Sequence, residues 1–255
     1  MIADSRSHGA ITTFFTDRIG GVSKGAYASF NLGLFSGDDR TKVMHNRSLL
    51  CGVLNIKPTH LVVPNEVHGS KVMVVDDEVL RLTEEQRDAT LRCDALVTRM
   101  TQVCLGVTVA DCVPVLFFDE AAGVVAAAHA GWKGIVSGVL PETVTAMRRK
   151  GCLSENIHAE IWPSISCAHF EVGEEVVARF AECFSGSEMR GIVDYGYPKP
   201  HLNLREAVRL QLAQAHLSSD HIWSHPDCTY GSSRYFSARR DGFASGRMVA
   251  GVFVG

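Results

Sequence analysis

The chain of 255 residues is 46% hydrophobic and 21% charged, which excludes a disordered protein and fits a globular domain with a sizeable core. With a formal net charge of −3, the chain shows no sign of the positive surface that binds nucleic acid or an anionic membrane, so we expect neither as a partner. No repeat or linker divides the sequence, and residues 1–255 are predicted to form a single domain.

Runs of apolar and β-branched residues predict eight buried strands. In chain order they cover residues 10–16, 71–75, 94–98, 103–109, 113–118, 124–130, 157–162 and 248–254. Helical patterns cover residues 41–54, 134–150, 173–184 and 203–217, and Pro141 should kink or restart the second of these helices. The class is α+β, with either a mixed sheet or two packed sheets covered by helices.

The eight cysteines form no CxxC pair and no evident disulfide framework, which is typical of free thiols in a reducing compartment. The N-terminal residues do not resemble a secretory signal, and no apolar stretch has the length of a membrane span. We therefore expect a cytoplasmic protein.

Three short stretches each carry a metal-ligand side chain beside a small residue. They are "EVHGS" with His68, "ADCVP" with Cys112 and "AHAGW" with His129. One thiolate and two imidazoles are a plausible ligand set for zinc, and three protein ligands leave the fourth position open, as in catalytic sites. Any one of these residues alone would more often be structural.

The surroundings of Cys112 and His129 indicate that the two side chains meet at one edge of a sheet. Gly131 and Gly134 would let the backbone approach a ligand closely, and a helix beginning after Gly134 would offer free N–H groups to an anion, with Lys133 adding charge. Alternatively, these glycines only fit a tight turn.

These motifs, taken together with others along the chain, resemble the laccase-domain family, which is also called the multicopper polyphenol oxidase family. The resemblance rests on "VHG", "ADCVPV", "HAGWKG", "TDRIGGVSKGAYASFNLG", "GDDRTKVMHNR", "FEVGEEV" and "CTYGSSRYFSARRDGFASGRM". Members of this family include purine nucleoside phosphorylases and a peptidoglycan-editing hydrolase. The resemblance implies β-sheets packed as a sandwich between helical layers.

The resemblance also implies a metal site, usually zinc with copper as the alternative, at His68, Cys112 and His129. The implied activities are phosphorolysis of adenosine, inosine, guanosine and methylthioadenosine, and deamination of adenosine at the same site. Copper-dependent polyphenol oxidation is a further activity described in the family. The chain contains no His-x-His pair of the kind that holds several coppers, which argues against that activity.

Deamination needs a zinc-activated water and an acid that moves the proton. Asp111 and Glu66 are the candidates for this acid, although Asp111 could instead orient a ligand histidine. If residues 62–69 are extended, Glu66 and His68 project to the same side; a turn at Pro64 or Asn65 would prevent this.

Phosphorolysis requires groups that bind an anion. Arg47, Arg18 and Lys133 are the candidate donors, and Asn31 and Glu66 complete the predicted substrate contacts. We expect a nucleoside and phosphate as the small-molecule partners of a monomer.

Two other classes of function remain open. Cys112 could be a nucleophile with His129 as its base, in a peptidoglycan-editing or other amide hydrolase. The chain could also be a binding module stabilised by zinc. A structural zinc site normally has four protein ligands, and no fourth candidate lies adjacent to the three motifs, although Cys93, Cys104 and Cys228 are possible fourth ligands.

The chain departs from the family pattern at three positions. Glu66 stands where the family generally has Gln, Trp162 replaces Gly, and Ser164 replaces Cys. If these positions touch substrate, the selectivity of the enzyme is expected to shift.

Overall fold

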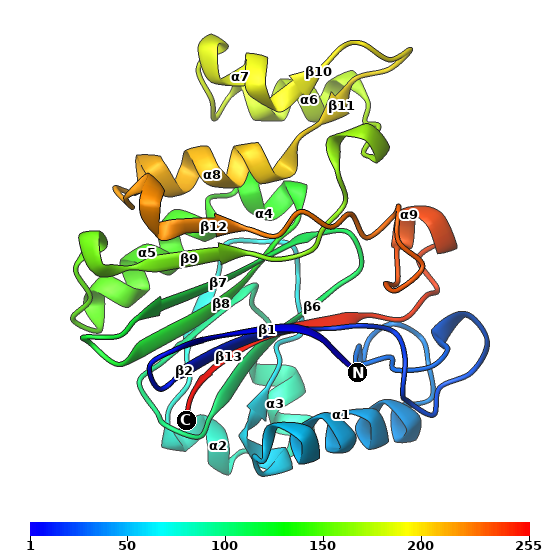
Figure 1. The fold of residues 1–255 in the computed structure, drawn as a ribbon, viewed down its shortest axis with the longest axis vertical. Helices are drawn as coiled ribbons and strands as arrows, with labels where there is room; N and C mark the ends of the chain where they lie inside the picture. Colours follow the sequence, from blue (N-terminus) through cyan, green and yellow to red (C-terminus); the bar gives the residue numbers. More distant parts are fainter.

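The computed structural model describes residues 1–255, and two mixed β-sheets form its centre (Figure 1). From edge to edge, the five-stranded sheet contains β1 (Ile2–His8), β2 (Ile11–Thr16), β13 (Met248–Val254), β6 (Cys104–Val109) and β3 (Leu61–Val62). The six-stranded sheet contains β12 (Ile222–Ser224), β9 (His158–Ile161), β7 (Val113–Asp119), β8 (Val124–Ala130), β5 (Ala95–Thr98) and β4 (Val72–Val74). A two-stranded sheet of β10 (Val193–Asp194) and β11 (His201–Leu202) lies apart from them.

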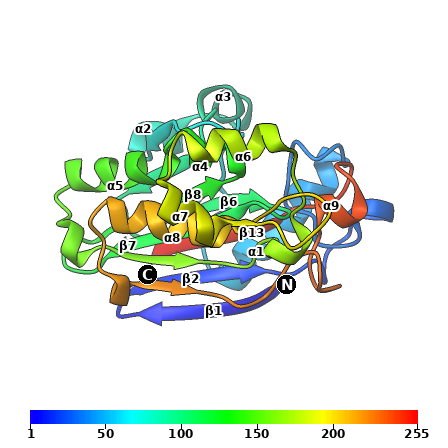
Figure 2. The same cartoon turned by 90° about the horizontal axis from the view of Figure 1, so that it is seen from above.

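Nine α-helices surround the sheets. They are α1 (Arg40–Leu54), α2 (Asp77–Arg81), α3 (Glu84–Thr90), α4 (Trp132–Val136), α5 (Val139–Arg149), α6 (Glu174–Ala181), α7 (Gly186–Ile192), α8 (Leu204–Gln214) and α9 (Ala238–Asp241). Helices α5 and α8 cover the outer face of the six-stranded sheet, and α1 lies on the far side of the five-stranded sheet (Figures 1 and 2). The predicted α+β sandwich with helices on both sides is therefore confirmed.

Strand β7 shows how the layers are filled. All seven of its residues are buried, because both faces of the strand are covered. Val115 and Phe117 point toward the helices, whereas Leu116 and Phe118 join the core between the two sheets, as the two-residue period of a strand requires. In β7 and its neighbour β8, the polar side chains Asp119 and His129 lie near the strand ends.

Each of the eight predicted strands is present, whereas the short strands β3, β10, β11 and β12 and the longer edge strand β1 were not predicted. The sequence of β1, "IADSRSH", lacks a continuous apolar run because it forms an edge of the sheet and exposes part of its side chains. Arg6 on this strand pairs with Glu160 of β9, with 2.6 Å between Nε and Oε1. A contact across 154 residues of chain leaves no local pattern in the sequence.

The helix predicted for residues 134–150 is two helices. Helix α4 already begins at Trp132, and the break falls at Gly138, whose φ of +82° lies in the left-handed region that glycine tolerates. Pro141 lies in the first turn of α5, where proline is accepted. Among all the helices, none combines the length and the apolar character that crossing a membrane demands.

Candidate active site

The three predicted ligands meet at one end of the hairpin formed by β7 and β8. Cys112 directly precedes β7, and His129 is the penultimate residue of β8. Since the strands are antiparallel neighbours, both residues lie at the same end of the hairpin. His68 reaches them from the loop between β3 and β4. The ligand atoms of the three residues all lie within 4.8 Å of one another.

A buried carboxylate, Asp94, orients two of the three ligands. Its Oδ1 lies 3.0 Å from His129 Nδ1 and accepts a hydrogen bond of 2.8 Å from the backbone N–H of His68. Its Oδ2 accepts a second backbone hydrogen bond, of 2.7 Å, from Gly69. Because Nδ1 of His129 faces this carboxylate, Nε2 is the nitrogen left for a metal.

Sequence reasoning did not select Asp94. Its only signal was an acidic residue at the start of a buried strand. Burial would raise the pKa of its carboxyl, but the hydrogen bonds from His129 and from the backbone of Gly69 and His68 lower the pKa below its usual value. The group is therefore held as a carboxylate, the form that can accept hydrogen bonds from all of these donors.

The backbone conformation of His68 shows that residues 62–69 do not form the extended segment that would point Glu66 and His68 to the same side. Regular strand structure ends at Val62, and His68 has a φ of +60° in the left-handed region. Residues 62–69 are therefore not a continuous strand, and Glu66 and His68 do not owe their direction to strand alternation. The hydrogen bonds to Asp94 hold the loop in this conformation.

Gly131 keeps the centre of the ligand cluster open. A Cβ at this position would lie 3.0 Å from Cys112 Sγ and 3.3 Å from His68 Cδ2. Two imidazoles and one thiolate form a donor set that suits zinc, with copper as the alternative. Cys93, Cys104 and Cys228 do not belong to the cluster. The residues therefore fit a metal ion held by three protein donors.

The charges in the cluster favour the thiolate form of cysteine. Burial would raise the pKa of Cys112, but the charge of His129 and hydrogen bonds with His129 and His68 lower the pKa to about 6. Burial lowers the pKa of His129, but Cys112 and Asp94 together raise it well above its ordinary value. A thiolate both binds metals and acts as a nucleophile, so the cluster suits either a metal site or a Cys–His pair.

The carboxylate of Asp111 holds the C-terminal segment rather than a ligand histidine. Its Oδ1 accepts a hydrogen bond of 2.6 Å from Thr229 Oγ1. Its Oδ2 accepts hydrogen bonds from Ser237 Oγ at 2.9 Å and from the backbone N–H of Arg239 at 2.7 Å. The alternative role for Asp111, orienting a ligand histidine, finds no support in these contacts, because Asp94 is the carboxylate beside His129 Nδ1.

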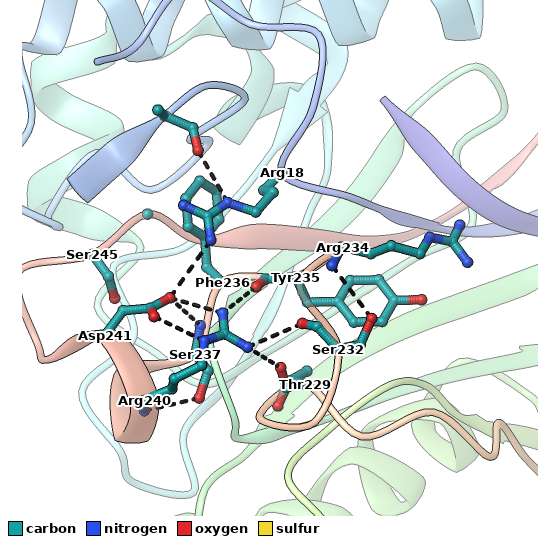
Figure 3. A network of polar contacts seen from close by, with 12 residues as sticks. Arg18, Thr229, Ser232, Arg234, Tyr235, Phe236, Ser237, Arg240, Asp241 and Ser245 are labelled. Carbon is teal, nitrogen blue, oxygen red and sulfur yellow. Dashed lines mark hydrogen bonds and ion pairs between the residues drawn. The ribbon is translucent and has the colours of Figure 1, made fainter. Parts of the chain in front are cut away.

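Arg240 organises the same C-terminal segment, as Figure 3 shows. Its guanidinium donates hydrogen bonds to the carbonyl oxygens of Thr229, Ser232 and Tyr235 and pairs with Asp241. Arg18 pairs with Asp241 at 3.7 Å and lies 4.5 Å from the Phe236 ring. Arg18 lines neither cavity beside the ligand cluster, so the structure does not place it where it could bind a substrate anion.

Two cavities adjoin the ligand cluster. A small one of about 230 Å³ includes Arg47, Glu66 and Arg247 in its lining. A larger one of about 750 Å³ is mainly apolar and includes Trp132 and Phe170. Only five residues line both cavities: His68, Ala110, Cys112, Ala238 and Phe243. The cluster therefore stands between a small space with two arginines and a large apolar space.

Three charged side chains dominate the small cavity. Burial lowers the pKa of Arg47 to about 10, although nearby Glu66 and Asp88 oppose that shift. Arg47 Nε donates to the carbonyl of Leu32 at 2.9 Å, and its other nitrogens make no hydrogen bond within the chain. Glu66 binds Thr108 through both carboxylate oxygens, at 2.7 Å to the backbone N–H and 2.8 Å to Oγ1.

Arg247 also lines the small cavity, and sequence reasoning missed it. Burial lowers the pKa of its guanidinium, while the neighbouring Cys112 and Glu66 oppose that shift. The signal that could have found it was its place in "ASGRM", inside the block that resembles the family.

Lys133 and Asn31, which were also predicted to contact substrate, do not line the small cavity. Lys133 is exposed on the lining of the large cavity, with Nζ 5.6 Å from the centre of the Trp132 ring. Asn31 is fully buried and lines neither cavity, because its side chain bridges the backbone of Gly33 and Arg247 to Ser36. Asn31 therefore supports the wall of the small cavity from behind.

The departures at Trp162 and Ser164 lie away from both cavities. Trp162 is fully buried between the sheets, 5.4 Å from the ring of Trp223. The buried Ser164 accepts hydrogen bonds from Arg205 through its hydroxyl and its carbonyl. Neither residue lines a cavity beside the cluster, so the expected effect on selectivity does not follow from direct contact.

Comparisons with known proteins agree with this architecture. A purine nucleoside phosphorylase of Bacteroides thetaiotaomicron is 39% identical over 251 residues, which cover 97% of this chain and 93% of that protein. Adenosine deaminase RL5 of an unknown prokaryotic organism is 34% identical, and the match covers 98% of this chain and 96% of that protein.

Solved structures show the same fold. YlmD from Geobacillus stearothermophilus superposes with a TM-score of 0.89 at 32% identity, covering 96% of this chain and 92% of that chain. Protein NMB0706 of Neisseria meningitidis has a TM-score of 0.86 at 33% identity, covering 100% of this chain and 98% of that chain. The family model described as multi-copper polyphenol oxidoreductase laccase matches residues 12–255. The chain therefore belongs to this laccase-like family.

Proposed function

We propose that the protein is a zinc-dependent purine nucleoside phosphorylase that also deaminates adenosine at the same site. The observation that carries this proposal is the three-donor cluster of His68, Cys112 and His129, which opens onto a small cavity with two arginines and a large apolar one. The names of the relatives, several phosphorylases and one deaminase, support both activities.

His68, Cys112 and His129 would hold a zinc ion, which would lower the pKa of a bound water to about 7 and so supply the nucleophile for deamination at C6 of adenine. The chain's own residues prepare the site. Cys112 and His129 bind the metal, and Asp94 fixes the orientation of His129. We assign proton transfer to Asp111, which lines the large cavity beside Cys112.

Phosphorolysis fits the division between the cavities. The free N–H groups of Arg47 bind phosphate in the small cavity, and Arg247 adds positive charge there. The large cavity receives the purine against apolar side chains, with the exposed Lys133 at its rim. Glu66 shapes the small cavity through Thr108, and Asn31 supports its wall. Adenosine, inosine, guanosine and methylthioadenosine are the proposed substrates of a cytoplasmic monomer.

A second function has a specific observation in its favour. The lowered pKa of Cys112 beside His129 suits a thiol nucleophile and its base, as in a peptidoglycan-editing or other amide hydrolase. Metal content separates the two functions, since a thiolate that binds zinc is a poor nucleophile. Copper-dependent polyphenol oxidation by several coppers finds less support, because the chain has one three-donor cluster.

The test combines metal analysis of the purified protein with a product screen. We expect about one zinc per chain. Adenosine and inosine should release ribose 1-phosphate only when phosphate is present, and adenosine should also give inosine. Cleavage of a muropeptide amide with no nucleoside turnover would favour the hydrolase.

The ligand assignment has its own control. The Cys112→Ala variant should lose metal and both activities together, because a cluster of two histidines holds the ion weakly. Cys183→Ala removes an exposed free thiol outside the cluster and should change neither. Full metal content and full turnover in Cys112→Ala would contradict the assignment.

A further inference from the structure

Phe243 is the most exposed of the large hydrophobic side chains, with 88% of its surface accessible. Single exposed apolar residues are common on protein surfaces, so exposure by itself assigns no role. The position of Phe243 is what distinguishes it. It is the only large apolar side chain among the five residues that line both cavities.

The backbone of Phe243 is fixed although its ring is free. Helix α9 ends at Asp241, and Gly242 follows as its C-cap: its φ of +85° turns the chain out of the helix, and its N–H donates to the carbonyl of Ala238 at 3.0 Å. On the other side, Arg247 Nη2 donates to the carbonyl of Phe243 at 3.1 Å, and Nη1 donates to the carbonyl of Ser245 at 2.7 Å. An aromatic ring is therefore held beside the ligand cluster by a braced segment.

The chemistry of a free ring at this place favours a flat aromatic ligand. Aromatic side chains bind nucleobases by stacking, which uses the face of the base and tolerates changes at its edges. The two cavities together offer charged groups for phosphate but no other exposed aromatic ring that borders both spaces. A base stacked on Phe243 would lie beside Cys112 and His68, the two ligands that share the boundary with it.

We propose that Phe243 stacks on the purine base of the substrate and so holds the nucleoside against the metal centre. This inference rests on the proposed nucleoside activity. Because stacking contacts only the face of the base, adenosine, inosine and guanosine should depend on Phe243 to the same degree. Phosphate, which carries no ring, should not depend on it.

The test measures steady-state kinetics of Phe243→Ala together with equilibrium binding of free adenine. We expect KM for adenosine and inosine to rise about tenfold while kcat stays within about threefold, because the loss of a contact made equally in the ground and transition states raises KM alone. Adenine affinity should fall by the same factor. KM for inorganic phosphate and zinc content should remain at the wild-type values.

Two further variants separate stacking from a general disturbance. Phe243→Trp keeps a stacking ring, so it should retain a low KM, and adenine should quench its fluorescence beyond the quenching seen in the wild-type protein. Tyr195→Ala is the matched control, since Tyr195 is 64% exposed and lines neither cavity. It should leave KM, kcat and adenine affinity unchanged.

The outcomes distinguish this inference from the proposed function. If the wild-type protein converts nucleosides but Phe243→Ala keeps its KM and adenine affinity within twofold, the role of Phe243 is overturned and the function stands. If adenine binds in a Phe243-dependent way without any turnover, the stacking role stands and the function is overturned. If neither binding nor turnover occurs, both are overturned.

Discussion

Two buried carboxylates beside the ligand cluster support different parts of the site. Asp94 is fully buried and takes hydrogen bonds from the His129 ring and from the loop that carries His68. Asp111 is adjacent in sequence to Cys112, yet its three donors come from residues 229–239 of the C-terminal segment. Proximity to a ligand along the chain therefore does not reveal which carboxylate positions a ligand.

The contrast indicates that metal binding and substrate binding are supported by separate segments. The strand side, with Asp94 directly before β5, sets the positions of the ligands. The C-terminal side, fastened to Asp111, forms the wall that includes Ala238 and Phe243. Changes on the two sides should consequently have different effects on metal content and on turnover.

The largest effect is expected for Asp111→Asn. Turnover of adenosine should fall more than about a hundredfold while zinc is retained, since loss of a general acid or base typically costs 10²–10⁴ in rate. An amide facing Ser237 and the Arg239 backbone would also leave a donor mismatch, so thermal melting should fall by a few degrees.

Ser237→Ala separates the two roles of Asp111. It removes one hydrogen bond to the carboxylate but leaves the acid in place, and turnover should fall less than about tenfold. Turnover of Asp111→Asn within tenfold of wild type at equal zinc content would remove the proton-transfer role.

An intermediate effect, on metal affinity, is expected for Asp94→Asn. Loss of the carboxylate that orients a ligand histidine typically lowers metal affinity about 10- to 100-fold. Competition with a chelating dye would measure the change. Asp119→Asn is the matched control, because Asp119 is a buried acid at the opposite end of β7 and should leave zinc affinity unchanged. Equal zinc affinity in both variants would contradict the division between the two carboxylates.

The smallest effect is expected for Glu66→Gln. A glutamine can accept from the Thr108 backbone with its oxygen and donate to Thr108 Oγ1 with its amide, so it can keep both contacts. Zinc content should be unchanged, and turnover should fall less than about tenfold. Glu66→Ala removes both contacts and should cost more. A larger loss in Glu66→Gln than in Asp111→Asn would move proton transfer to Glu66.

The sequence predicted the features that have local patterns. Buried strands such as β7 appear as apolar runs, and the three ligands lie in short motifs at the ends of such runs or beside a glycine. The bond between Asp94 and His129 spans 35 residues, and the bond from Arg247 to Asn31 spans 216. Pairings across such distances depend on the folded topology, so no spacing in the sequence could reveal them.

The position of β13 has a consequence for biosynthesis. This strand lies between β2 and β6, so the interior of the five-stranded sheet is completed by a segment that leaves the ribosome after all of its neighbours. Until β13 emerges, the facing edges of β2 and β6 have no partner, and Arg247, directly before β13, has not reached the small cavity. Pairing over such sequence distances is slow, so those open edges are the part of the nascent chain exposed to pairing with other strands during synthesis.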